Sequence, residues 1–177
     1  MARRTATRRE LEQHSFHPAV VLLAAGIMLF FGMYLPHLFP RFALLDLPLI
    51  IVIYFAISMR SPIAGTLIGA SVGILQDLAT NAPIGILGIA KSIVGYAAAS
   101  ISLRVDVENV LSRAILNFGF TLLQSCILYA VNHWMLDLPT SHLLWLHELL
   151  RAAVNTVVAM PISFLLDRMR AESWQRR

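Results

Sequence analysis

Charged residues are scarce in this sequence. Only 14% of its 177 residues are Asp, Glu, Lys or Arg, while 58% are apolar. A soluble domain has about 25% charged residues, and a chain of ~150 residues leaves about a third of its surface in water. The composition therefore excludes an ordinary soluble enzyme, and it also excludes a disordered chain. It favours a single-domain, all-α, polytopic membrane protein.

Cysteine and lysine are nearly absent. The one cysteine, Cys126, cannot form an internal disulfide or a cysteine cluster, and we expect it to be buried as a small apolar side chain. Lys91 is the only lysine among the 14 basic residues. Most of the arginines adjoin apolar segments, so the net charge of +4 indicates membrane topology rather than nucleic-acid binding.

Long apolar segments dominate what remains. Six transmembrane helices are predicted, over residues 18–34, 47–59, 62–79, 84–103, 114–136 and 148–166. The sequence thus predicts a cytoplasmic basic arm over 1–17, one membrane domain over 18–166 and a cytoplasmic basic tail over 167–177. The second segment is shorter than the ~20 residues that usually cross a bilayer, but Asp46 fits its N-cap and Pro48 its first turn.

The arginines lie almost entirely on one side of this predicted topology. Eleven are on the side of the two termini, and only Arg41 is on the other. Because cytoplasmic loops carry an excess of basic residues, we expect both termini in the cytoplasm and the chain in a bacterial inner membrane. The short second segment is needed for this pattern, since five crossings would place the four arginines of the tail outside.

Small residues recur on one face of the third and fourth segments. Gly65, Gly69 and Gly73 are spaced by four in the third segment. The fourth has a similar face, formed by Gly88, Lys91, Gly95, Ala98 and Ser102. Such faces let helices approach closely in lipid. We expect the two segments to pack as an antiparallel hairpin, or one face to receive a helix of a partner protein.

Two charged residues lie within this hairpin. Asp77 is near the outer end of the third segment, and Lys91 is about two turns into the fourth. Charges inside a membrane usually pair or face a cavity. The positions predict an Asp77–Lys91 ion pair, with a polar site for a partner or ligand, or an ion relay, as alternatives.

The last two segments also carry polar residues. Asn117, Thr121, Gln124 and Ser125 form one stripe on the fifth segment, which indicates hydrogen bonds between helices or the lining of a small cavity. On the sixth, the spacing of Glu148 and Arg151 predicts an ion pair, with Asn155 one turn deeper.

Enzyme signatures are incomplete or missing. The helix that begins at His147 has Glu148 but carries Arg151 where a zinc protease needs its second His. His133, His142 and His147 match no familiar metal-ligand spacing, and the sequence has no nucleophile elbow and no P-loop. We expect no catalytic residue, cofactor, metal, nucleic acid or small-molecule substrate.

The segment from Gly73 to Tyr96 resembles the MreD family of bacterial rod shape-determining proteins. The glycine-rich helix, the G-x-L-x-D-L signature, the short turn and the closing Gly-Tyr pair carry the likeness. The matching positions are Gly73, Leu75, Asp77, Leu78, Gly85, Gly95 and Tyr96. The length, the basic termini and the Leu47-Pro48 start of the second segment also look like that family.

The resemblance implies a non-enzymatic scaffold of the cell-elongation complex. Members act with MreC, and through it with MreB and the RodA–transpeptidase peptidoglycan synthase. A partner helix would dock on a small-residue face, Asp77 would fix the outer end of the third segment, and the basic ends would contact anionic lipid.

The main alternative is a substrate-binding subunit of an energy-coupling-factor vitamin transporter. Such chains are also compact with about six spans, and they bind a ligand in an outer polar pocket. Here that pocket would include Asp77, Lys91, Glu148, Arg151 and Asn155. The first segment lacks a clear Ala-x-x-x-Ala docking pattern, which weakens this reading. An intramembrane enzyme would depend on scattered polar residues alone.

Overall fold

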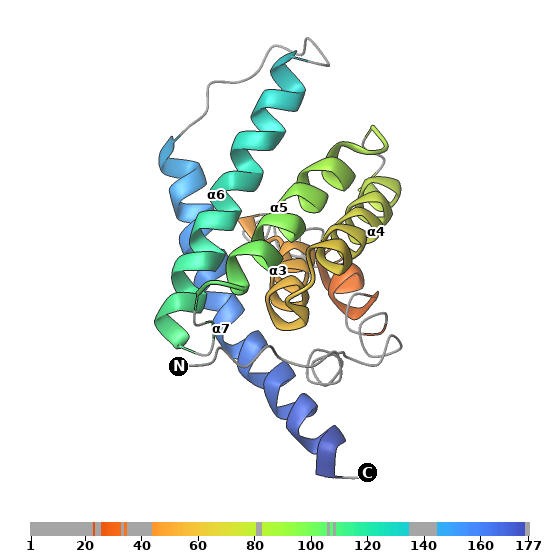
Figure 1. The fold of residues 1–177 in the computed structure, drawn as a ribbon. Coiled ribbons are helices and arrows are strands. Elements are labelled where there is room, and N and C mark those ends of the chain that lie inside the picture. Colours follow the sequence, from red (N-terminus) through yellow and green to blue (C-terminus); the bar gives the residue numbers. More distant parts are fainter. Residues whose placement is uncertain are drawn as a thin grey trace, which may run out of the picture.

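The computed structural model describes residues 23, 26–32, 34, 44–80, 83–105, 107, 109–134 and 145–175. Their regular elements are helices, and the described residues contain no strand, which confirms the all-α class. The helices are α3 (Leu47–Met59), α4 (Pro62–Thr80), α5 (Ile86–Ser102), α6 (Val110–Trp134) and α7 (Trp145–Gln175) (Figure 1). The described residues between 23 and 34 are helical too. The basic arm, most of the first predicted span, Arg41 and His142 lie outside the described residues.

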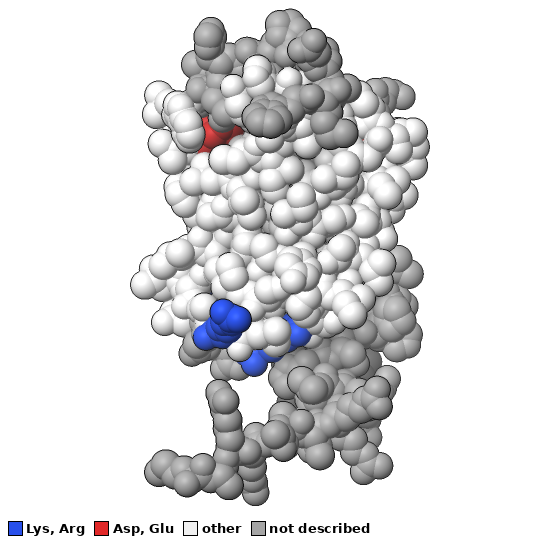
Figure 2. Space-filling view, turned by 45° about the horizontal axis from the view of Figure 1, so that its top comes forward, with Lys and Arg blue, Asp and Glu red and all other residues white. Residues whose placement is uncertain are grey.

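Three of these helices are long and apolar enough to cross a membrane. They are Pro62–Thr80, Val110–His133 and Trp145–Arg168, while α3 and α5 are shorter apolar helices. On the face seen in Figure 2, the described charged residues lie near the two ends, and a broad uncharged belt separates them. This arrangement is compatible with a membrane protein; the six crossings and the cytoplasmic termini remain predictions.

Helix α3 lies at the centre of the bundle. It has the predicted bounds, and every residue from Leu47 to Ile57 is buried. Its side chains are apolar on all sides, as in a helix enclosed by others, and α4, α5, α6 and α7 all pack against it. The predicted cap is confirmed, because the Asp46 carboxylate accepts a hydrogen bond from Leu49 N at 3.0 Å.

Helices α4 and α5 form the predicted antiparallel hairpin, which we call the glycine hairpin. Their backbones are so close that a Cβ atom on Gly69 would clash with the Lys91 carbonyl. A Cβ on Gly65 would likewise meet the Gly95 carbonyl, and one on Gly73 the Leu87 carbonyl. The other prediction, that a partner protein uses this glycine face, is therefore wrong, because α5 already fills it.

The largest differences from the predicted helix boundaries are at the start of α6 and at the end of α7. Helix α6 begins at Val110, four residues before the predicted start, because the Asn109 side chain accepts a hydrogen bond from Leu111 N and acts as a cap. Helix α7 continues through Gln175, so most of the predicted tail is helical. The residues after Leu166 are mainly good helix formers and include no Gly or Pro.

Cys126 is exposed on α6, so its predicted burial is wrong. It lies outside the polar stripe that turns toward the other helices. An apolar helix with few neighbouring helices leaves one of its apolar faces exposed. The apolar composition of the segment did not show that Cys126 lies on that face.

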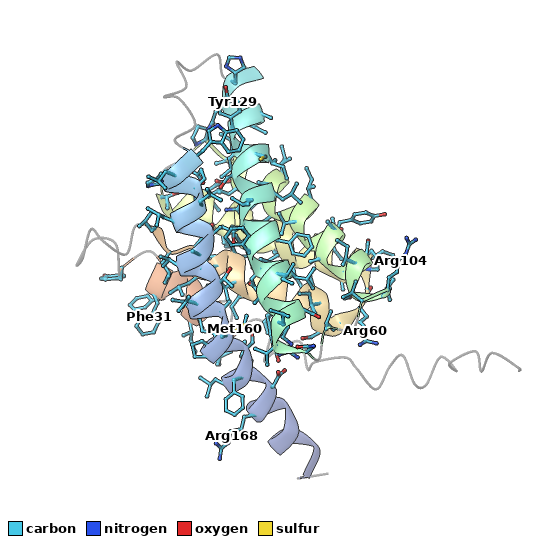
Figure 3. All side chains as sticks on the ribbon, turned by 90° about the vertical axis from the view of Figure 1, so that its left-hand side faces the viewer. Phe31, Arg60, Arg104, Tyr129, Met160 and Arg168 are labelled. Carbon is cyan, nitrogen blue, oxygen red and sulfur yellow. The ribbon has the colours of Figure 1, made fainter. Side chains whose placement is uncertain are left out.

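Arginines gather at one end of the described bundle, which we call the arginine end. Arg60 follows α3, Arg104 follows α5, Arg113 is in the first turn of α6 and Arg168 is late in α7. Figure 3 places Arg60, Arg104 and Arg168 away from the end of α6 that carries Tyr129. Asp167 joins three helices there, because it pairs with Arg113 and accepts a hydrogen bond from the Tyr54 hydroxyl at 2.8 Å.

Candidate functional site

The main polar feature is a largely buried group of charged and amide side chains toward the other end of the bundle. We call it the charge cluster. It consists of Asp46, Lys91, Gln124, Glu148, Arg151 and Asn155. It unites the N-cap of α3 with α5, α6 and α7, four elements that are distant in sequence.

Asp46 is the centre of the cluster. Both of its carboxylate oxygens lie 2.9 Å from the Lys91 ammonium, and one accepts a hydrogen bond from Gln124 Nε2 at 2.7 Å. Asp46 is 4% exposed and Lys91 is fully buried. One carboxylate therefore caps α3 and also binds α5 and α6.

The predicted Asp77–Lys91 ion pair is not formed. The Lys91 ammonium instead binds Asp46 and lies 3.1 Å from Gln124 Oε1. Lys91 lies on the side of α5 that also meets α3 and α6, and the cap of α3 reaches it there. The sequence identified Lys91 as an intramembrane polar contact but left Asp46 as a cap only.

Asp77 binds the turn of the glycine hairpin. Its carboxylate accepts hydrogen bonds from the backbone N–H groups of Gly85 at 2.8 Å, Leu87 at 3.2 Å and Gly88 at 3.3 Å. These donors begin α5, so the negative charge also lies at the positive end of that helix. Gly85 has φ 104°, a left-handed conformation that favours glycine. The spacing of Asp77 and Gly85 thus has a structural reason.

The stripe on α6 divides into two pairs. Gln124 and Ser125 bond across helices, because Gln124 reaches Asp46 and the Ser125 hydroxyl donates to Glu148. Asn117 and Thr121 donate to carbonyls of their own helix, at 3.0 and 2.8 Å. The prediction of hydrogen bonds between helices is confirmed for the first pair.

Helix α7 contributes the remaining members. Asn155 Oδ1 accepts a hydrogen bond from the Asp46 backbone N–H at 2.9 Å. The Arg151 guanidinium is 3.5 Å from Asp46 and 3.9 Å from Glu148, which confirms the predicted Glu148–Arg151 pair as a long contact. Arg151 therefore lies between two carboxylates and close to neither.

Two donors at this edge of the cluster have no partner among the described residues. They are Arg151 Nε and Asn155 Nδ2, and both atoms are buried. Buried polar groups nearly always have a hydrogen-bond partner, so these two need an explanation.

Other predicted residues lie away from the cluster. Leu75 and Tyr96 point outward from the glycine hairpin and are 52% and 57% exposed. Gly95 packs on Gly65 inside the hairpin. No group of three or more metal-ligating side chains forms among the residues that the structure describes.

The charges of the cluster balance. Asp46 and Glu148 oppose Lys91 and Arg151, so the group is neutral as a whole. Burying ions costs several kcal/mol per ion before their attraction is counted, so such a pair fixes one arrangement of helices more than it adds stability. Chemically, the arrangement can bind helices together and can offer unpaired donors to an acceptor.

Comparisons with protein families, curated proteins and solved structures find no match to this chain.

Proposed function

We propose that this chain is a non-enzymatic scaffold of the bacterial cell-elongation complex in the inner membrane, with both termini cytoplasmic. The likeness of its Gly73–Tyr96 segment to MreD suggests this function. One observation supports it most. The motif residues divide into an inner set that closes the hairpin and an outer pair, Leu75 and Tyr96, that is exposed.

The outer face of the glycine hairpin is the proposed partner surface. It carries a set of large, exposed apolar side chains from both helices: Ile63, Leu67, Ile74, Leu75, Leu78, Ile89, Ile93 and Tyr96. The glycine face is filled by the chain itself, so a partner helix has to dock on the outside. We propose that MreC provides that helix, and that MreB, RodA and the elongation transpeptidase associate through it.

The arginine end is the proposed cytoplasmic face. Arg60 and Arg104 are exposed there. Basic residues near an anionic leaflet each contribute about 1 kcal/mol to membrane attachment. Lipid would thus orient the scaffold, while the hairpin would bind the partner.

Co-purification with MreC tests the proposal. The full chain and tagged MreC from the same host are expressed together and purified in mild detergent. The double variant Leu75→Ala/Tyr96→Ala should reduce the recovered complex about tenfold. A few large anchor side chains usually supply most of the binding energy of an interface, and this variant removes two of them.

The matched control is Phe164→Ala/Leu165→Ala on α7. These residues are 70% and 58% exposed, and α7 packs on α6 and α3 rather than on the hairpin. The control should bind MreC normally. Equal recovery with both double variants would refute docking on the hairpin, and failure of the wild-type chain to bind MreC would refute the scaffold function.

One observation favours the transporter-subunit alternative. Lys91, Glu148, Arg151 and Asn155, four of the five residues assigned to that pocket, do converge, although Asp77 does not join them. Mass spectrometry of the same eluate separates the two functions. A stoichiometric metabolite together with ATPase subunits would favour the transporter.

A further inference from the structure

The charge cluster is open at one edge. Lys91 and Asn155 are fully buried, but the side chains of Arg151 and Glu148 are 22% and 19% exposed. His147, beside Glu148 in the chain, is more exposed still. A group from outside the bundle can therefore reach Arg151 and Glu148 first.

This edge has donors to offer. The ion-pair contacts of Arg151, at 3.5 and 3.9 Å, are longer than hydrogen bonds, and its Nε has no partner among the described residues. Asn155 lies one helical turn further along α7, and its Nδ2 has no partner in this part of the chain either, although the residue is completely buried. Two adjacent unpaired donors, one of them cationic, match the oxygens of a phosphate group.

The neutrality of the cluster limits what can bind. A purely anionic group would add an uncompensated negative charge next to Asp46 and Glu148. A group that also carries an ammonium leaves the site neutral, because the ammonium can pair with Glu148 while the phosphate pairs with Arg151. The Arg151 contacts are also the longest in the cluster and so the easiest to exchange, and the guanidinium can turn to the phosphate.

The depth of this edge fits a lipid headgroup. Arg151 follows the exposed Trp145 by six residues, which is about 9 Å along a helix. Tryptophan is enriched at the membrane–water interface. Glu148 and Arg151 are thus expected within about 9 Å of the interface in the leaflet opposite the arginine end, where the long Arg151 side chain can extend toward the headgroups.

We propose that Arg151, Asn155 and Glu148 form a binding site for a zwitterionic phosphate–ammonium headgroup. Arg151 and Asn155 donate to the phosphate, and Glu148 accepts from the primary ammonium. The source is either phosphatidylethanolamine of that leaflet or a free phosphoethanolamine. The site requires neither MreC nor the proposed scaffold function.

Native mass spectrometry of the full chain in detergent tests the site. The probes are phosphatidylethanolamine and phosphatidylglycerol with identical acyl chains, since the second has a phosphate but no ammonium. The wild-type chain should bind phosphatidylethanolamine about tenfold more tightly, as expected for one charge-assisted hydrogen bond.

Two variants separate the two halves of the headgroup. Arg151→Lys keeps the charge but loses the donor fork, so it should weaken binding of both lipids about tenfold. Glu148→Gln should remove the preference for phosphatidylethanolamine, because it removes the acceptor of the ammonium and also lowers the repulsion of the anionic phosphatidylglycerol, which should then bind at least as tightly as to the wild-type chain. Arg60→Lys, at the arginine end, is the matched control and should change neither.

The source is decided by competition. If free O-phosphoethanolamine displaces the lipid, the headgroup alone is recognised; if it does not, the acyl chains are required. Equal affinity of the wild-type chain for the two lipids would overturn the proposal. Lipid binding that is unchanged in both variants would also overturn it, because the lipid would then bind the apolar surface of the bundle without using Arg151 or Glu148.

Discussion

The glycine hairpin and the charge cluster join helices in opposite ways. In the hairpin, Gly65, Gly69 and Gly73 bring two backbones into contact. In the cluster, a carboxylate between two cations connects four elements. The hairpin depends on the absence of side-chain volume where its two backbones meet. The cluster depends on the balance of its charged side chains, of which Asp46 and Lys91 are buried.

The difference shows how two kinds of helix pairing can be specified in an apolar protein. Apolar side chains alone discriminate poorly between helix partners in lipid, where the surroundings are equally apolar. Close contact between backbones selects a partner helix by shape, and here it pairs two helices that are consecutive in the sequence. A buried charge selects a distant partner, because leaving it unpaired costs about 3–5 kcal/mol.

The largest loss of stability is expected in the glycine hairpin, because two backbones in contact cannot make room for a side chain. Gly69→Leu would drive a side chain into the Lys91 backbone, so α4 and α5 must separate, at a cost above the ~1–3 kcal/mol of ordinary overpacking. We expect loss of the cooperative thermal unfolding transition in detergent. Gly119→Leu is the control, because a Cβ there meets nothing within 4 Å. Similar melting temperatures for the two variants would contradict close packing in the hairpin.

The next effect should come from breaking the charge balance. Lys91→Met leaves Asp46 buried without its nearest cation, which should cost about 3–5 kcal/mol of unfolding free energy. Adding Asp46→Asn should recover part of that loss, because the buried negative charge is then removed. Thermal unfolding of both variants measures this. A double variant less stable than Lys91→Met would show that charge balance is not what the cluster requires.

The smallest loss of stability is expected at the turn of the glycine hairpin, where a charged side chain and close glycine packing act together. Asp77→Ala removes the acceptor of three backbone N–H groups at the start of α5 and should cost about 1–3 kcal/mol. Asp77→Asn should cost less, since it retains one oxygen. Hydrogen exchange at Gly85, Leu87 and Gly88 should speed up in the alanine variant. Unchanged exchange would show that the turn is fixed by glycine packing alone.

Local features of this fold were predictable, and distant ones were not. The bounds of α3, its Asp46 cap and the pairing of α4 with α5 follow from spacing, capping and small residues that lie close in sequence. The Asp46–Lys91 contact spans 45 residues and the Asp46–Gln124 contact 78. Periodicity shows which face of a helix is polar, but it does not show which distant helix meets that face.

One signal of the missed site was present in the sequence. Asp46 interrupts an otherwise apolar segment after Arg41, where a charge is expensive unless it has a partner. That cost argues for a buried cation, and Lys91 is the one lysine of the chain. The exposed Cys126 had no such signal, because a small apolar side chain is tolerated on either side of a membrane helix.

The complete enclosure of α3 has a consequence for biogenesis. Its 13 residues span about 20 Å, less than the ~30 Å hydrocarbon core, and its cap carries a charge. While the ribosome is still making α4, neither Lys91, Gln124 nor Arg151 exists to meet Asp46. Helix α3 therefore gains the partners of its cap one after another, Lys91 with α5, Gln124 with α6 and Arg151 with α7, and a chain that stops before α7 leaves the charge cluster incomplete.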